Sequence, residues 1–200
     1  AEELGRACAP IPFASTVYFV AEALMKFGSQ EQKAKWLPKI AAGEVIGAFA
    51  TAEGKGPVTV RSIKTSVSGG KLTGEKIPVT DGDVADLIVV LAKDGLYLVE
   101  KGEGVSAEVL TTLDPTRSAA KLTFSGAPAE RLGDEDGIAA MQAVFDRAAI
   151  LLAFEQVGGS DKCLEMAKAY ALERHAFGRA IAGYQAVSYT HLRAHETRGN

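Results

Sequence analysis

The chain has 200 residues, of which 47% are hydrophobic and 24% charged, and this composition is typical of a globular protein with a sizeable core. Its formal net charge of −3 excludes a protein that binds nucleic acid through bulk positive charge. Cys8 and Cys163 form no C-x-x-C pair, which argues against a disulfide scaffold and a zinc site, and every apolar stretch is interrupted before it could span a membrane.

The two ends of the chain predict a piece of a longer protein. The sequence opens at Ala1 inside a polar and apolar pattern, and it stops at Asn200 without a closing element. We therefore draw no conclusion about targeting from the first residues.

The first segment, residues 1–43, is predicted to be helical. Apolar side chains recur at helical spacing as far as Phe27, and Gly28 ends that helix. Ser29 and Gln32 then form a capping-box pattern that opens a second helix.

The middle segment, residues 44–133, is predicted to form a small antiparallel β-barrel or sandwich. Short apolar strands follow one another closely, and turns rich in glycine and proline separate them. Gly69-Gly70 and Asp94-Gly95 are typical of hairpin turns.

The last segment, residues 134–187, returns to helical spacing after a group of acidic residues that favours a helix N-terminus. Gly158-Gly159 within it is either a break or a point of close packing in one long helix. The predicted order is therefore helices, a small β domain, and long helices.

Residues 188–200 are predicted to be a non-native tail, because apolar periodicity stops and the run resembles translated sequencing-adapter DNA. His191 and His195 are four residues apart and could meet on a helix face. They have no third ligand nearby, so we predict no metal site.

Three segments in chain order together resemble the acyl-CoA dehydrogenase family over about residues 1–187. They are Gly28–Pro38 followed by Ala42-Gly43-Glu44, then Gly74-Glu75-Lys76 with Thr80-Asp81-Gly82 and Ala85-Asp86, and lastly Tyr170–Arg174 with Phe177-Gly178 and Gln185. The resemblance implies an α+β multidomain fold: an N-terminal helical domain (1–43), a middle β domain (44–133) and the start of a C-terminal four-helix bundle (134–187).

The same resemblance implies a function, the FAD-dependent oxidation of an acyl-CoA thioester to its α,β-enoyl form. Phe49 and Thr51 match the segment that lies beside the flavin, and Val79 and Thr80 match residues that hydrogen-bond the flavin through backbone and hydroxyl groups. The alternatives are a buried strand followed by a surface loop at the first pair, and an ordinary strand threonine at the second.

The last matching segment implies contacts with the FAD of a neighbouring subunit. Arg174, Phe177 and Gln185 match these positions, and the planar guanidinium of arginine pairs well with a pyrophosphate. The alternative for Arg174 is a solvated cation at a helix end. Asp146 matches a substrate-lining position, whereas Arg147 is interpreted as a helix-surface ion.

No catalytic residue is predicted within the chain. In most of the family the catalytic glutamate lies downstream of this segment, and where a minority place it earlier the matching residue is Ala148. Glu155 is interpreted as a structural polar group. We therefore expect the 200 residues alone to be inactive.

The implied partners are an acyl-CoA substrate, further copies of the chain in a homodimer or homotetramer, and electron-transfer flavoprotein as electron acceptor. The resemblance also implies a bacterial-type cytoplasmic protein. Departures from the family at Ala52, Val58, Pro78 and Ala149 suggest a divergent member. Two alternatives stay open: an acyl-CoA-binding partner subunit without redox activity, and a related flavoenzyme that uses oxygen.

Overall fold

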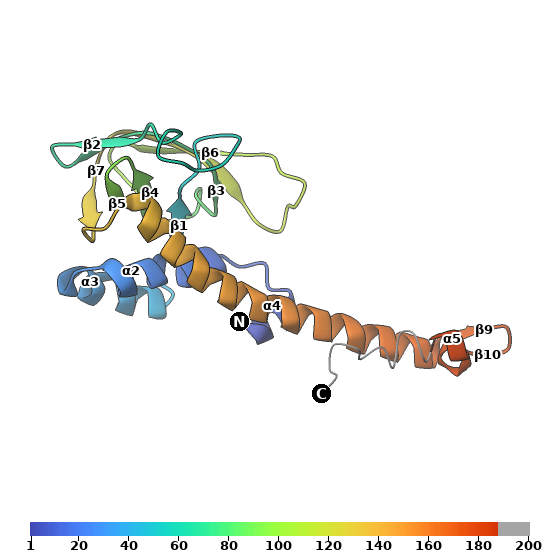
Figure 1. Cartoon of the computed structure of the whole chain (residues 1–200). Helices are drawn as coiled ribbons and strands as arrows, with labels where there is room; N and C mark the ends of the chain where they lie inside the picture. The colour runs from blue at the N-terminus through green and yellow to red at the C-terminus, as the bar shows by residue number, and fades with distance from the viewer. Residues whose placement is uncertain (188–200) are drawn as a thin grey trace. The chain divides into compact units, whose positions relative to one another are not determined.

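The structure, a computed structural model, describes residues 1–187 of the chain (Figure 1). The chain divides into a larger compact unit, Pro10–Leu152, and a second unit made of residues 1–9 and the described residues from 153 to 187. The two units are described separately. The expected tail at 188–200, with His191 and His195, lies outside the described residues.

The larger unit starts with three consecutive helical segments. They are the π-helical segment η1 (Ala14–Ala21), α2 (Glu22–Phe27) and α3 (Gln30–Ala41). The predicted capping box is present, because the Gln32 backbone N–H donates to Ser29 Oγ at 3.1 Å and the Ser29 N–H donates to Gln32 Oε1 at 3.0 Å.

The helical spacing of the first segment predicted α geometry, but η1 is wound as a π-helix. The Thr16 hydroxyl donates to the Pro12 carbonyl oxygen at 2.7 Å, and the Ser15 hydroxyl oxygen lies 3.1 Å from the same carbonyl oxygen. Side-chain donors of this kind compete with the backbone for helical carbonyl groups, and this competition accompanies the altered winding.

The strands form two four-stranded sheets. In the first, the order is β1 (Gly47–Ala50), β4 (Leu87–Ala92), β5 (Gly95–Glu100) and β8 (Glu130–Leu132). In the second, it is β2 (Ser66–Ser68), β3 (Lys71–Thr80), β7 (Ala119–Pro128) and β6 (Val105–Val109). Figure 1 shows α2 and α3 on one side of these strands.

The expectation of an α+β fold with antiparallel sheets is confirmed, with one exception. Both predicted hairpins form, with Ser68 opposite Lys71 and Ala92 opposite Gly95. The exception is that β1 pairs with β4 in parallel. A parallel pair needs a long crossover connection, and here the β2–β3 hairpin is part of that connection.

Strand β4, inside the first sheet, is buried on both faces. Along β4, Leu87, Val89 and Leu91 belong to a core shared with the helices, while Ile88 and Val90 belong to a core between the two sheets. A strand covered on both sides can be apolar at every position, which explains its continuous apolar run.

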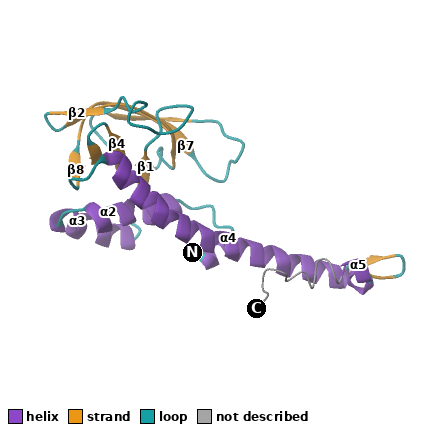
Figure 2. Cartoon of the chain, in the orientation of Figure 1, coloured by secondary structure: helices purple, strands orange, loops and turns teal. Residues whose placement is uncertain are grey.

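Helix α4 (Gly137–Glu173) begins in the larger unit and continues into the second. Asp136 caps its start, because its carboxylate accepts the N–H groups of Ile138 and Ala139, each at 3.0 Å. Figure 2 draws α4 without a break. By length and composition, α4 is the one described helix that meets the test for a membrane span, a test that the core helix of a soluble protein also passes.

The second unit joins the start of the chain to its later part. Besides the end of α4 it contains α1 (Glu2–Ala7), β9 (His175–Ala176), β10 (Arg179–Ala180), η2 (Ile181–Gly183) and α5 (Gln185–Val187). Arg6 of α1 pairs with Asp161 at 2.6 Å and also with Glu165.

Gly158 is a point of close packing and not a break in α4. A Cβ atom at Gly158 would lie 1.9 Å from the backbone oxygen of Glu2. At Gly159 the nearest atom, the Gly5 oxygen, would lie 3.4 Å away, which is an ordinary contact.

The two neighbouring glycines therefore allow a matched test. We expect Gly158→Ala to lower the free energy of unfolding by about 1–3 kcal/mol, because the methyl group has no space. Gly159→Ala should leave it unchanged or raise it by up to about 1 kcal/mol, because alanine favours helix. Thermal unfolding of both variants checks this, and equal stabilities would contradict the packing described.

Candidate functional site

A cavity of about 230 Å³ in the larger unit brings together three of the residues singled out from the sequence, Phe49, Thr51 and Thr80. They come from the end of β1 and the end of β3. The other lining residues are Ala14, Ser15 and Phe19 of η1, Pro78, Arg117 and Phe145.

Contacts between η1 and the start of β1 hold this wall of the cavity in place. The Gly47 N–H donates to Thr16 Oγ1 at 3.0 Å. A Cβ atom at Gly47 would lie 2.8 Å from the Cβ of Val20, so only glycine permits this approach. Phe19, on the same segment, is thereby set against Phe49.

A buried ion pair fixes the other wall. Lys76 Nζ lies 2.7 Å from Glu53 Oε1 and 3.2 Å from the carbonyl oxygen of Thr51. The Lys76 side chain is 0% exposed and that of Glu53 is 9% exposed. Because Lys76 belongs to β3 and Thr51 follows β1, the pair ties the two strands that supply the cavity's threonines.

The carboxylate of Glu53 is held from several directions. It also accepts the backbone N–H groups of Lys64 at 2.7 Å and Thr65 at 3.0 Å. Burial alone would raise the pKa of Glu53, but the hydrogen bonds from Lys76 and Thr65 bring it below its usual value. Burial lowers the pKa of Lys76, and the attraction of Glu53 opposes that change.

Three phenylalanine rings form the apolar part of the cavity. The ring centroids of Phe19 and Phe49 are 6.0 Å apart and stacked, and Phe145 lies 5.7 and 5.9 Å from them. Such spacing is typical of stabilising aromatic pairs. The sequence did not indicate Phe19 or Phe145 as site residues, because their spacing is that of ordinary core positions on a helix.

The polar part of the cavity consists of hydroxyl groups and one guanidinium. Among residues 1–187, the hydroxyls of Thr51 and Thr80 have no hydrogen-bond partner, so both are available to a ligand. Arg117 pairs with Asp81, 36 residues away in the sequence. No local sequence signal reveals a partnership over that distance, and sequence analysis missed Arg117.

Two other residues singled out from the sequence lie outside the cavity lining. Val79 is 1% exposed, and its side chain packs between the two sheets. Only its backbone, next to Thr80, is left to contact a ligand. Asp146 is exposed on α4 and accepts a hydrogen bond from Gln142 Nε2 at 2.7 Å. Arg147, interpreted as a surface ion, pairs with Glu22.

Arg174, Phe177 and Gln185 belong to the second unit. Arg174 is exposed just after α4, and Phe177 is 98% exposed at the turn between β9 and β10. Phe177 adopts a φ of 53°, in the left-handed region, next to Gly178 at 84°. Gln185 begins α5.

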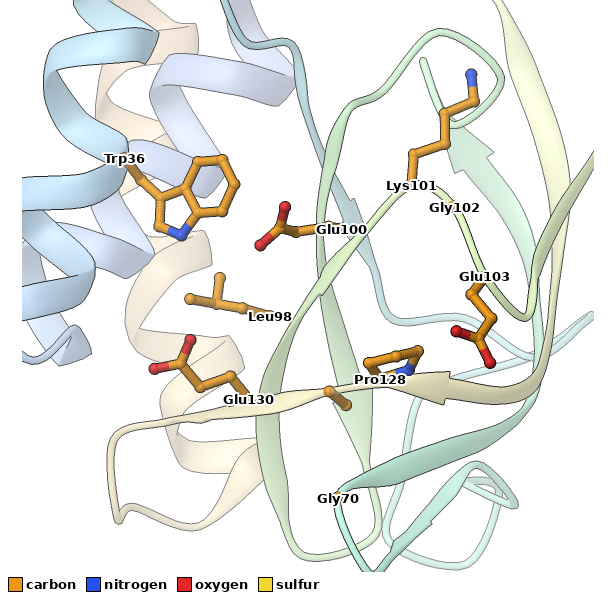
Figure 3. A pocket seen from close by; sticks show the side chains of 10 residues that line it. Trp36, Gly70, Leu98, Glu100, Lys101, Gly102, Glu103, Pro128 and Glu130 are labelled. Atoms are coloured by element: carbon orange, nitrogen blue, oxygen red, sulfur yellow. The ribbon is translucent and has the colours of Figure 1, made fainter.

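A larger cavity, of about 430 Å³, contains none of the candidate cofactor-binding or substrate-binding residues predicted from the sequence. Figure 3 shows Trp36, Leu98, Glu100 and Glu130 around it. Glu100 pairs with Lys35 at 2.6 Å, and Glu130 accepts a hydrogen bond from Gln32 Nε2 at 2.7 Å. Glu100 and Glu130 thus already have internal partners, and none of the candidate site residues lines this cavity, so we regard the smaller cavity as the candidate site.

The lining of the smaller cavity suits a flat, partly polar ring. It offers aromatic faces, the free hydroxyls of Thr51 and Thr80, and the guanidinium of Arg117, with no carboxylate among the lining residues. A metal is not indicated, because no group of three or more His, Cys, Asp or Glu side chains in the described part of the chain could hold one.

Comparison with known proteins identifies two family models in the chain. The model described as acyl-CoA dehydrogenase, N-terminal domain, matches residues 1–44. The model described as acyl-CoA dehydrogenase, C-terminal domain, matches residues 135–195.

Similar proteins cover almost the whole chain. The acyl-CoA dehydrogenase IpdE2 of Mycobacterium tuberculosis is 32% identical over 94% of this chain and 48% of its own length. PigA, solved with FAD and proline, has a TM-score of 0.83 and 27% identity over 96% of this chain and 56% of its own. Butyryl-CoA dehydrogenase from Megasphaera elsdenii shares the fold, with a TM-score of 0.85 at 24% identity over 96% of this chain and 56% of its own. The chain thus spans about half the length of the curated relatives it matches.

The Lys76–Glu53 pair generates a stability prediction. We expect Lys76→Met to lower the free energy of unfolding by about 3–5 kcal/mol, because it leaves a buried carboxylate without its cation. The double variant Lys76→Met, Glu53→Gln should lose less than the sum of the single losses. Denaturant unfolding checks this, with Lys71→Met, at an exposed position of the same strand, as the control.

The same pair predicts a pH dependence. The pKa of Glu53 is lower in the folded than in the unfolded state, so its stabilising effect is present above the usual glutamate pKa and is lost as pH falls through the folded-state value. Stability of the unmodified protein should therefore fall in acid more steeply than that of Glu53→Gln. Parallel pH profiles of the two proteins would contradict this expectation.

Proposed function

This chain belongs to the acyl-CoA dehydrogenase family, and on that premise we propose that it forms part of an FAD-dependent enzyme that oxidises an acyl-CoA thioester to its α,β-enoyl form. The observation that most directly supports this proposal is that Phe49, Thr51 and Thr80 line one cavity although Thr80 is far from the other two in the sequence. That cavity is the place we propose for the isoalloxazine ring.

The residues present fit such a ring. The aromatic rings of Phe19, Phe49 and Phe145 in the lining suit a planar aromatic system, and the free hydroxyls of Thr51 and Thr80 suit its polar edge. The backbone of Val79, next to Thr80, adds further hydrogen-bonding groups. When bound, FAD would supply the hydride acceptor for the β-hydrogen of the substrate.

The remaining FAD contacts are proposed to come from a second copy of the chain. Arg174, Phe177 and Gln185 would reach the cofactor of a neighbouring subunit, with Arg174 on the pyrophosphate. The exposure of Arg174 and Phe177 supports this role, because both side chains are available to a partner. It implies a homodimer or homotetramer.

The base that takes the substrate's α-proton is proposed to lie outside these residues. No carboxylate lines the cavity, and Ala148 is a buried core residue of α4. Asp146 is proposed to contact the substrate at the adjoining helix. We accordingly propose that the chain by itself does not turn over.

The proposed electron acceptor, location and substrate class follow from membership of the family. We propose electron-transfer flavoprotein as the electron acceptor and the bacterial cytoplasm as the location, with no membrane span. The acyl group of the substrate is proposed only as a class, a CoA thioester with hydrogens at both α and β carbons.

Absorbance of the purified full-length protein tests the function. We expect a yellow protein whose flavin band bleaches when an acyl-CoA is added without oxygen. A colourless protein that still binds CoA esters would instead identify a partner subunit without redox activity. Rapid oxygen consumption without an added acceptor would identify an oxygen-using flavoenzyme.

A single hydroxyl tests the placement of the ring. Thr80→Val should weaken FAD binding roughly fivefold, because one net hydrogen bond contributes about 1 kcal/mol. Thr73→Val, at an exposed position of the same strand, is the matched control and should bind FAD like the unmodified protein. Equal FAD dissociation constants for all three proteins would overturn this placement.

A further inference from the structure

Arg117 is the only charged residue among those that line the candidate cavity. Its Nη2 donates to Asp81 Oδ2 at 2.8 Å, and the Ser15 hydroxyl donates to the same oxygen at 2.6 Å. The Asp81 N–H also donates to the carbonyl oxygen of Ser118 at 3.0 Å. The guanidinium is therefore oriented by a buried carboxylate that is itself held in place.

The burial and backbone conformation of Asp81 suit it to orient the guanidinium of Arg117. It is 3% exposed, and it holds a φ of 56° directly after β3, a conformation that aspartate adopts more readily than most residues. Asp81 does not line the cavity, whereas Arg117 does. A ligand in the cavity would thus meet the cation and not its counter-ion.

Asp81 does not use all the donors of Arg117. A guanidinium carries five N–H groups, and one nitrogen, Nη2, faces Asp81. Within the described part of the chain, Nε is buried and unpaired, and Nη1 has no hydrogen-bond partner. An ion pair that served only to stabilise the fold would be expected to use Nε, because an unpaired buried donor is costly.

We propose that Arg117, oriented by Asp81, contacts the flavin bound in the cavity and raises its reduction potential. This inference rests on the proposed function. Reduction by two electrons and one proton leaves the isoalloxazine with a negative charge, and a nearby cation stabilises that form more than the neutral oxidised one. Arg117 would then set the reduction potential of the flavin, while the hydroxyls of Thr51 and Thr80 contribute to its binding.

The test measures reduction potential and FAD dissociation constant in the full-length, FAD-loaded protein. We expect Arg117→Gln to weaken binding of reduced FAD about tenfold relative to oxidised FAD, which corresponds to a fall in potential of about 30 mV for a two-electron couple. Arg117→Lys should restore much of the potential because it keeps the charge.

Asp81→Asn provides a second variant with the opposite sign. It removes the counter-charge while keeping the shape, so the potential should rise. Arg131→Gln is the control, because Arg131 pairs with Asp94 at 3.4 Å but does not line the cavity, and its potential should match the unmodified protein.

The outcomes separate this inference from the proposed function. An unmodified protein that binds no FAD overturns both. A yellow protein whose potential is unchanged in Arg117→Gln and in Asp81→Asn overturns the role of Arg117 alone. Opposite shifts in these two variants, with none in Arg131→Gln, support it.

Discussion

The buried ammonium group of Lys76 is the interaction on which the candidate cavity depends. A fully buried lysine is stable only when it is paired, and both of its partners, the Thr51 carbonyl and the Glu53 carboxylate, follow β1. Lys76 itself lies on β3. One ion pair thus sets how the end of β1 meets β3, and so where Thr51 and Thr80 stand. The two strands thus place part of the site, and η1, α4 and the loop that holds Arg117 supply the rest.

Sequence patterns predicted those parts of the fold whose partners are close in the chain. The capping box at Ser29 and the turns at Gly69 and Asp94 are local, and all three are present. The parallel pairing of β1 with β4 depends on how a long connection crosses the sheet, which no local pattern records. The π-helical winding of η1 accompanies a hydrogen bond from the Thr16 hydroxyl to the Pro12 carbonyl oxygen, and helical spacing in the sequence does not predict it.

Sequence patterns likewise predicted some residues of the candidate site and not others. Phe49, Thr51 and Thr80 were found because they match a family's pattern, and the structure brings them into one cavity. Phe145 and Arg117 were not found, although they line the same cavity. Their partners lie far away in sequence, and an isolated phenylalanine on a helix or an isolated arginine in a loop has an ordinary structural explanation.

The second unit is discontinuous in the chain, since residues 1–9 pack with residues beyond 153. During synthesis residues 1–9 are made before the rest of this unit, and the acidic partners of Arg6, Asp161 and Glu165, follow more than 150 residues later. The continuous unit between them can fold while the ribosome is still working. Arg6 is therefore synthesised long before the residues it pairs with, and a chain that stops before Asp161 leaves Arg6 without these partners.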